Sequence, residues 1–355
     1  MSDKPAKGRR ESIFKKSDIA TVAIILIAFV ALMVVIELIQ GQFKFFTVAN
    51  WLNILMQNAV VGIMAMGMML IITTGNIDVS VGAQYAVAGM VVALVARTTG
   101  GEKPLLAILA GMGTGMVLGL TNGLIVAKLG IPAIVVTLGT LNIMRGTLNL
   151  ITSGNWIDGL TGPFSKFANL RLLKPVNAFG PIHALTGGKG LTLFALPLAV
   201  YIWIIVMILT YIFLYRSGVG RDILAVGGNK EAAKRMGLSQ TKAYLLAFGY
   251  MGMLAGLASA VAASKIKIAQ PSNGTGYEMK LIAACVIGGT EFSGGVASIL
   301  GTLLGVIDNG LVLTKVPAYW QELATGVIII LAVASSVFRS MGGTTRKARN
   351  GGEKK

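Results

Sequence analysis

Long apolar stretches recur along the chain, and they restrict its fold more than any other feature. A hydrocarbon core of roughly 30 Å is crossed by a helix of about 20 apolar residues, and many segments reach that length. Hydrophobic residues make up 54% of the sequence and charged residues 13%, whereas about a quarter of the residues in a soluble domain are charged. The sequence therefore predicts an all-α, polytopic membrane protein.

We expect about ten transmembrane helices, all within residues 19–338. The eighth is short and runs into a glycine-rich segment, so we expect a broken or re-entrant helix that other parts of the protein shield from lipid. The predicted spans are Ile19–Ile39, Trp51–Ile72, Val81–Ala96, Leu105–Ala127, Pro132–Leu150, Leu191–Tyr215, Ala243–Ser264, Met279–Ile287, Val296–Leu313 and Tyr319–Phe338.

The basic residues predict the orientation, because Lys and Arg are retained on the cytoplasmic side of a membrane. Residues 1–18, 216–242 and 339–355 each carry six of them, and an even number of spans puts all three segments on one side. With Lys128, that side holds 19 of the 31 basic residues. We expect cytoplasmic basic tails at 1–18 and 339–355 and multi-pass insertion in a membrane. The net charge of +17 then serves orientation and contact with anionic lipid, and we expect no nucleic acid partner.

The sequence shows no motif for catalysis, nucleotide binding or metal binding. It contains no G-x-x-x-x-G-K-[ST] loop for nucleotide phosphates and no Ser, Cys or His constellation that would form a nucleophile. Cys285 and His183 each occur alone, so neither a disulfide nor a metal site is indicated. We expect no catalytic residue, no metal and no cofactor.

An internal repeat points to transport. Gly115, Gly119, Asn122, Gly123, Leu124 and Val126 are echoed by Gly301, Gly305, Asn309, Gly310, Leu311 and Val312. A Lys and a Pro-Ala pair follow each copy, and spans five apart run in opposite directions. This arrangement predicts an inverted repeat, which permits alternating access around a central site. Tight helix packing alone also produces small-xxx-small spacing, and that alternative stays open for the glycines.

Polar residues at membrane depth are candidates for a translocation pathway or gate, because they are costly unless they face protein or water. Asp78 also suits a simple role as the cap of the third span, and Arg145 could extend along its helix to the headgroups. The candidates are Asn76, Asp78, Ser80, Asn122, Arg145, Asp308 and Asn309.

The basic segment 216–242 between two spans reads like the surface of a soluble protein. Asn229 is a good N-cap, Glu231 suits the positive end of a short helix, and Gly237 suits its C-terminal end. Two turns of helix are unstable alone, so we expect something to pack on this helix. An ordinary solvated connector is the alternative.

Four stretches of unusual composition follow one another in a fixed order. They are Gly75 to Gly82; Val136 to Thr140 with Arg145 and Gly146; Gly227 to Asn229 with Glu231, Ala232, Ala233 and Gly237; and Gly276 to Glu278 through Gly288 and Gly289 to Ser293, Gly294 and Gly295. Together they resemble the membrane permease subunits of bacterial ATP-binding-cassette (ABC) importers for sugars, the ribose, galactose and xylose group.

Within that group, several details are most similar to the autoinducer-2 import permease. These details are Asn76 to Ser80, Trp156 to Leu160, Gly274 to Lys280 and Pro317 to Trp320. Rhamnose-type and other pentose or hexose permeases remain competitors.

The resemblance implies a type II-like ABC importer permease that forms the pathway for a monosaccharide or autoinducer-2. It implies three protein partners: an ATPase subunit that binds ATP and Mg, a periplasmic or lipid-tethered substrate-binding protein, and a second permease chain, identical or paralogous. Residues 216–242 become the coupling loop, with Gly228, Asn229, Glu231, Ala232, Ala233 and Gly237 against the ATPase. Residues 152–190 become an outer loop that receives the binding protein.

Three other functions remain open. An ion-coupled secondary transporter needs a carboxylate deep in a span, for which Asp308 is the main candidate. A pore or membrane scaffold needs no energy source. An ABC permease for branched-chain amino acids is the related alternative.

Overall fold

The structure is a computed structural model that describes residues 48–171, 196–287, 289–290 and 294–297, together with Val34, Val35 and Leu38. Within these residues the regular elements are helices, joined by turns and two isolated β-bridges. The helices are α2 (Val48–Thr73), α3 (Val81–Thr98), α4 (Pro104–Leu129), α5 (Ala133–Thr152), α6 (Phe164–Phe167), α8 (Leu198–Arg216), α9 (Gly218–Gly228), α10 (Lys230–Arg235), α11 (Gln240–Ile266) and α12 (Tyr277–Ile287).

Five of these helices, α3, α4, α5, α8 and α11, are long and apolar enough to cross a membrane. Each overlaps a predicted span, and α2 and α12 overlap two more. The all-helical prediction is confirmed for the described part of the chain. The tenth predicted span and most of the first and ninth lie outside the described residues, so the number ten stays a prediction.

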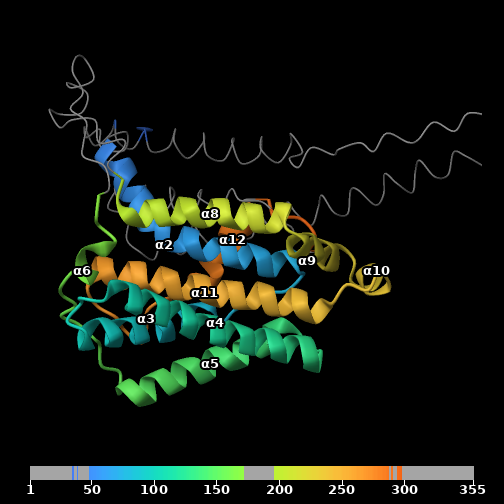
Figure 1. Cartoon of the computed structure of the whole chain (residues 1–355), viewed down its shortest axis with the longest axis horizontal. Helices are drawn as coiled ribbons and strands as arrows, with labels where there is room; N and C mark the ends of the chain where they lie inside the picture. Colours follow the sequence, from blue (N-terminus) through green and yellow to red (C-terminus); the bar gives the residue numbers. More distant parts are fainter. Residues whose placement is uncertain are drawn as a thin grey trace, which may run out of the picture.

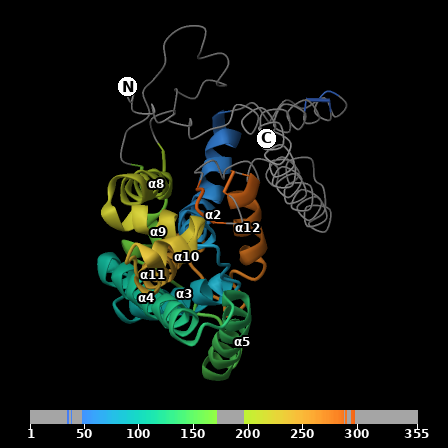
Figure 2. The ribbon, with the colours of Figure 1, turned by 90° about the vertical axis from the view of Figure 1, so that its right-hand side faces the viewer.

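The long helices run side by side, with α11 in the middle (Figure 1). One side of α11 packs on α2, which also contacts α8, and the other side packs on α3 and α4. Helix α5 lies beyond α3 and α4, and α12 lies beside α2 (Figure 2). Apolar side chains alone do not hold such helices together in lipid, so close packing has to do so.

That close packing is clearest between α4 and α11. A Cβ added to Gly115 would lie 2.0 Å from the carbonyl oxygen of Gly252, and one added to Gly256 would lie 2.1 Å from that of Gly111. The small-xxx-small spacing in α4 therefore serves tight helix packing, which was one of the two interpretations of the spacing. The repeat partner at residues 301–312 lies outside the described residues.

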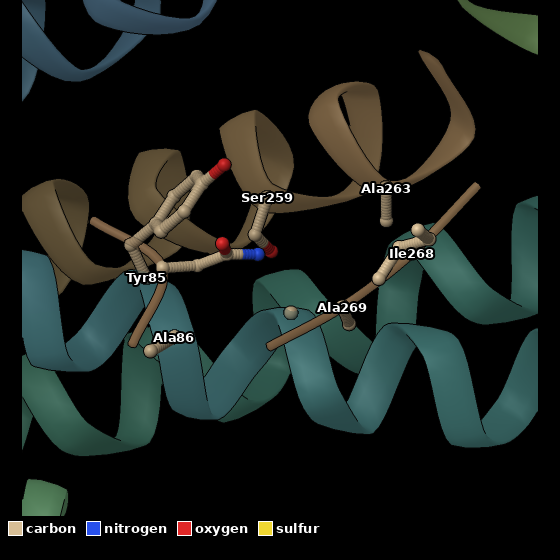
Figure 3. A pocket seen from close by; sticks show the side chains of 8 residues that line it. Tyr85, Ala86, Ser259, Ala263, Ile268 and Ala269 are labelled. Carbon is tan, nitrogen blue, oxygen red and sulfur yellow. The ribbon is translucent and has the colours of Figure 1, made fainter. Parts of the chain in front are cut away.

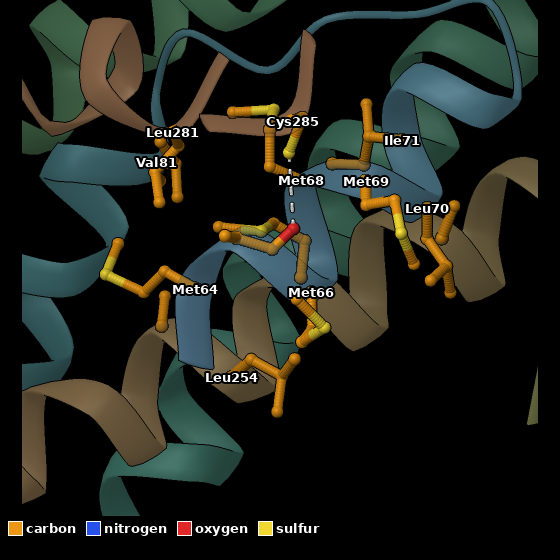
Figure 4. Packing of buried hydrophobic residues seen from close by; sticks show 14 of the residues in the cluster. Met64, Met66, Met68, Met69, Leu70, Ile71, Val81, Leu254, Leu281 and Cys285 are labelled. Carbon is orange, nitrogen blue, oxygen red and sulfur yellow. Dashed lines mark hydrogen bonds between the residues drawn. The ribbon is translucent and has the colours of Figure 1, made fainter. Parts of the chain in front are cut away.

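Methionines fill much of the core around α2 (Figure 4). Met64, Met68 and Met69 are almost completely buried, and flexible thioethers suit the irregular gaps between helices. Cys285 of α12 is buried beside them and donates to the carbonyl oxygen of Ala65 at 3.4 Å. The lone cysteine is a small core residue, as its apolar neighbours in the sequence indicated.

The outer loop is ordered as far as it is described. Phe164 of α6 is fully buried, and Ser264 of α11 donates to its carbonyl oxygen at 2.6 Å. Ile157 forms an antiparallel bridge with Ala269. Trp156, in contrast, is 59% exposed, so Phe164 anchors the loop and Trp156 does not.

Candidate functional site

The turn between α2 and α3 begins with Gly75, whose φ of 74° lies in the left-handed region that glycine adopts without strain. The half-buried Asn76 donates to the Thr74 hydroxyl at 2.9 Å, and Thr74 donates to the carbonyl oxygen of Ile71 at 2.6 Å. Asn76 therefore stabilises the turn itself. The chain then runs to Asp78, which is fully buried.

Asp78 is the centre of a buried polar network. One carboxylate oxygen accepts from the Ser80 backbone N–H at 2.8 Å and from the Ser80 hydroxyl at 2.6 Å. The other accepts from the Gln84 amide at 2.7 Å. Gln84 also donates to the Ser80 hydroxyl at 2.9 Å, as does Asn122 of α4 at 2.8 Å. We call Asp78, Ser80, Gln84 and Asn122 the Asp78 cluster; all four are fully buried.

The Asp78 cluster joins three helices at one point, because α5 also contacts it through the turn. The Val79 backbone N–H donates to the Thr137 hydroxyl of α5 at 3.1 Å. A buried carboxylate is tolerated only when hydrogen bonds replace its water shell, and here three donors do so. The network can therefore lock the turn against α3, α4 and α5.

Sequence reasoning identified three of the four cluster members and missed Gln84. Gln84 could have been found from the sequence, because it is an amide four residues after Ser80 and so lies on the same face of an apolar helix. The alternative that Asp78 itself caps α3 is wrong in detail. The N-cap residue is Ser80, whose side chain makes no capping bond; Asp78 instead accepts the N–H of Ser80.

Two amide oxygens of the cluster, on Gln84 and Asn122, are buried without a hydrogen-bond partner among the described residues. The Gln84 oxygen lies against α11, since it would be 3.0 Å from a Cβ added to Gly252. A buried polar atom without a partner costs about 1–3 kcal/mol. The cluster therefore has spare acceptors for a rearranged network.

The other pathway candidates are not part of this cluster. Arg145 is half-buried, and its guanidinium donates to the carbonyl oxygen of Pro271, so in this structure it ties α5 to the segment before α12 and does not extend to the headgroups. Asp308 and Asn309 lie outside the described residues.

The predicted short helix in the basic segment is present as α10, at one end of the helix layers (Figure 1). The Asn229 side chain accepts from the Ala232 N–H at 2.9 Å, as an N-cap does. After the helix, Gly237 has a φ of 78°. The N–H of Leu238 donates to Ala233 and that of Gly237 to Lys234, both at 3.0 Å, which is a Schellman C-cap.

Most of α10 is exposed and only Ala233 is buried. Lys230 lies 5.7 Å from the centre of the Tyr244 ring of α11, so the helix is held at one edge while Glu231 and Met236 are exposed. The sequence did not predict α9, which precedes α10 and is capped by the Ser217 hydroxyl.

Glycines connect α9 to the turn that carries Asp78. We define the glycine junction as Gly75, Gly227, Gly294 and Gly295. The Gly295 N–H donates to the carbonyl oxygen of Thr73, the last residue of α2, at 2.8 Å. A Cβ on Gly227 would lie 1.7 Å from that same oxygen, and one on Gly294 would lie 3.0 Å from the nitrogen of Gly75. Three backbones are therefore in direct contact with no side chain between them.

A small pocket between α3, α11 and the segment after α11 is lined by Tyr85, Ser259, Ala263, Ile268 and Ala269, among others (Figure 3). It has room for about one water molecule. A monosaccharide does not fit, so this pocket is not a solute site in the described conformation. Among the described residues no group of three or more His, Cys, Asp or Glu could hold a metal ion.

Comparison with known proteins gives a consistent picture. The model of a family described as the branched-chain amino acid transport system permease component matches residues 50–333. The ribose import permease protein RbsC of Escherichia coli is 37% identical over 311 residues, which are 86% of this chain and 91% of the relative. That of Bacillus subtilis is 34% identical over 291 residues, 80% of this chain and 83% of the relative.

The autoinducer 2 import system permease protein LsrC of an Enterobacter species is also 37% identical, over 273 residues, 76% of this chain and 73% of the relative. The identities to the ribose and autoinducer 2 permeases are equal, so the comparisons do not favour autoinducer 2 as the resemblance from sequence did. No solved structure matches the chain.

Proposed function

Because the chain belongs to the branched-chain amino acid transport system permease component family, we propose that it is the transmembrane permease subunit of an ABC importer for ribose or autoinducer 2. The alignment of 86% of the chain with a ribose import permease carries this proposal. As a permease it is a transport subunit and not an enzyme. ATP and magnesium bind to the partner ATPase.

We assign the protein to the bacterial inner membrane, as a multi-pass protein with both termini in the cytoplasm. The basic residues of 1–18, 216–242 and 339–355 support that orientation. We further propose that the whole chain forms ten transmembrane spans in a type II-like arrangement with an inverted repeat.

The Asp78 cluster serves as a gate element in this proposal. Its bonds join the turn at Asp78 to α4 through Asn122 and to α5 through Thr137, so a shift of the turn changes how these helices pack. The two unpartnered amide oxygens supply acceptors for a second arrangement. Such exchange of partners is what a two-state gate requires.

Helix α10 serves as the coupling helix. Glu231 is exposed for contact with the ATPase, whereas Ala233 and the capping residues Asn229 and Gly237 fix the shape of the helix. From α10 a movement passes to α9, then through the glycine junction to the end of α2 and the turn at Asp78. Direct backbone contact makes this route stiff, since there are no flexible side chains to absorb the movement.

The partners follow from an ABC importer permease: an ATPase subunit below, a substrate-binding protein above and a second permease chain, identical or paralogous, alongside. The outer loop 152–190 is the proposed landing surface for the binding protein. The burial of Phe164 supports a formed surface there.

The test is uptake by proteoliposomes that contain this chain, its ATPase and its binding protein. ATP-dependent, vanadate-sensitive accumulation of ribose or autoinducer 2 is expected. Leucine uptake instead would support a branched-chain amino acid permease, a cargo that the family description also allows. Uphill accumulation by the permease chain alone, driven by an ion gradient, would refute the proposal in favour of a secondary transporter.

A further inference from the structure

The Gln84 amide is held with its nitrogen toward Asp78 and its oxygen away from it. The nitrogen donates to Asp78 Oδ2 at 2.7 Å and to the Ser80 hydroxyl at 2.9 Å, whereas the oxygen is buried without a partner among the described residues. A Cβ added to Gly252 would lie 3.0 Å from that oxygen and 2.0 Å from the carbonyl oxygen of Gly115. Two acceptor oxygens therefore face one point of the contact between α4 and α11.

A half turn of the Gln84 amide about its last side-chain bond would exchange its two ends. The nitrogen would then face the Gly115 carbonyl oxygen, which has a second lone pair to accept a hydrogen bond. The amide oxygen would stand beside the Asp78 carboxylate, which is also an acceptor when it is ionised. A proton on Asp78 removes this conflict, because a carboxylic acid donates through its O–H.

The Asp78 carboxylate has no counter-charge among the described residues. It is fully buried, and the groups that act on it are the neutral donors of Ser80, Gln84 and Asn122. The nearest element with a cation at mid-helix is α5, but its Arg145 interacts with the charge of Glu278 and donates to the carbonyl oxygen of Pro271. Asp78 is therefore held by neutral hydrogen bonds alone.

The other titratable side chains on the packed helices do not supply that charge either. Helix α3 packs on α4, α5, α11 and α12, and the turn at Asp78 follows α2, which carries no titratable residue. Within the described part of the chain, none of the remaining titratable groups on these helices acts on the Asp78 carboxyl. They are Tyr85 and Arg97 of α3, Lys128 of α4, Lys242, Tyr244, Tyr250 and Lys265 of α11, and Tyr277, Lys280 and Cys285 of α12.

Two opposing effects therefore meet at Asp78. Burial without a counter-charge favours the neutral acid, since a buried charge is far more costly than a buried neutral group. Three donated hydrogen bonds favour the carboxylate. Water comes close enough to exchange a proton, because Asn76, Ile77 and Val79 on either side of Asp78 are partly exposed.

We propose that Asp78 binds a proton and that this proton switches the Gln84 amide between two partners. In the carboxylate form the Gln84 nitrogen donates to Asp78, as in the described arrangement. On protonation Asp78 Oδ2 takes a proton from water, forms an O–H bond and loses its charge. The new O–H donates to the Gln84 oxygen, and the released nitrogen donates to the Gly115 carbonyl oxygen.

The switch changes which helices are joined. In the acid form Gln84 ties α3 to the close contact between α4 and α11, whereas in the carboxylate form it ties α3 only to the turn at Asp78. The proposal rests on the gate role given above for its effect on uptake, but proton binding itself can be measured without transport.

Infrared difference spectra of the reconstituted importer test proton binding directly. They are taken between about pH 5 and about pH 9, which spans the range that buried carboxyl groups reach. A carboxylic acid has a C=O stretch that is separate from the carboxylate and amide bands. We expect such a band at low pH, lost as the pH rises and missing from the Asp78→Asn importer. Glu102→Gln removes an exposed carboxyl and is the matched control that keeps the band.

Gln84→Met tests the switch and also serves where Asp78→Asn does not assemble. The variant takes a donor from the carboxylate and an acceptor from the acid. Hydrogen bonds to an ionised group are roughly twice as strong as neutral ones, so the carboxylate loses more and the band should persist to higher pH. An unchanged band in Gln84→Met would overturn the role of the amide.

Uptake is compared as the ratio of the unsubstituted importer to the Asp78→Asn importer at each pH, so that effects of pH on the ATPase and the binding protein cancel. The ratio should change at least threefold, because asparagine donates to the Gln84 oxygen at every pH. A constant ratio would overturn the link between the proton and the gate. An Asp78 band that is absent at every pH, or present at every pH, would overturn the switch. Loss of ATP-dependent uptake in both importers would refute the importer function and leave the spectral result valid.

Discussion

Replacing Gly227 by alanine should break the contact between the coupling segment and the Asp78 turn. The new Cβ would lie 1.7 Å from the carbonyl oxygen of Thr73, whereas ordinary contact begins near 3.4 Å, so two backbones have to separate by about 1.7 Å. That movement cannot be absorbed by a rotamer change and should disrupt the 2.8 Å bond from the Gly295 N–H to Thr73.

The expected free energy follows from three contributions. Overpacking costs about 1–3 kcal/mol, and the lost hydrogen bond costs about 1 kcal/mol. The higher helix propensity of alanine returns about 1 kcal/mol. The junction should therefore be weakened by about 1–3 kcal/mol, which corresponds to roughly 5- to 150-fold in a conformational equilibrium.

Gly218→Ala is the matched control. It lies in the same helix, but its Cβ would meet only the end of the Arg221 side chain, at 4.0 Å. We expect normal coupling from this variant.

The assay is the ratio of solute taken up to ATP hydrolysed in proteoliposomes with the complete importer, at equal amounts of permease in the membrane. Gly227→Ala should lower the ratio at least fivefold, mainly through uptake, and Gly218→Ala should leave it unchanged. Equal ratios in the two variants would show that the glycine junction does not transmit the movement.

Substitutions at three further positions, Asp78, Glu231 and Gly115, test separate parts of the structure. Asp78→Ala should reduce uptake at least tenfold, because it removes the acceptor of three hydrogen bonds. Asp78→Asn should retain more uptake, because the Gln84 amide can turn its unpartnered oxygen toward the new donor. Equal uptake by the two variants would argue against the network. Glu231→Lys, at an exposed position, should leave membrane abundance unchanged and lower solute-stimulated ATP hydrolysis, and unchanged stimulation would remove Glu231 from the ATPase contact. Gly115→Ala should lower the melting temperature in detergent by several degrees, because the new Cβ would lie 2.0 Å from the α11 backbone. Gly113→Ala is the control: its Cβ would meet nothing within 4 Å, so this variant should melt like the unsubstituted protein.

Local sequence signals predicted several parts of the candidate sites. Asn229 and Gly237 bound α10 as the capping pattern predicted, because caps depend on hydrogen bonds within a few residues. The polar turn from Asn76 to Ser80 was recognisable because amide, carboxylate and hydroxyl groups interrupt two apolar spans. Neither signal requires knowledge of which helices are neighbours.

Other parts depended on contacts between distant segments. The four glycines of 218–228 give little local reason for a helix, yet α9 forms with Ile223 and Val226 buried against the bundle. Asn122 reads as an isolated amide in an apolar helix until the packing of α4 on α3 brings it to Ser80.

The sequence alone determined that this chain is a helical membrane protein. It also placed both ends of α2, α3, α4, α5, α11 and α12 to within about three residues, because the length of an apolar run and the cap residues are local properties. Only the tertiary structure decided that Asn122 of α4 bonds to Ser80 and that Gly227 meets the end of α2. Those facts depend on how helices pack, and packing is set by the combined shape of side chains from segments that are far apart in the chain.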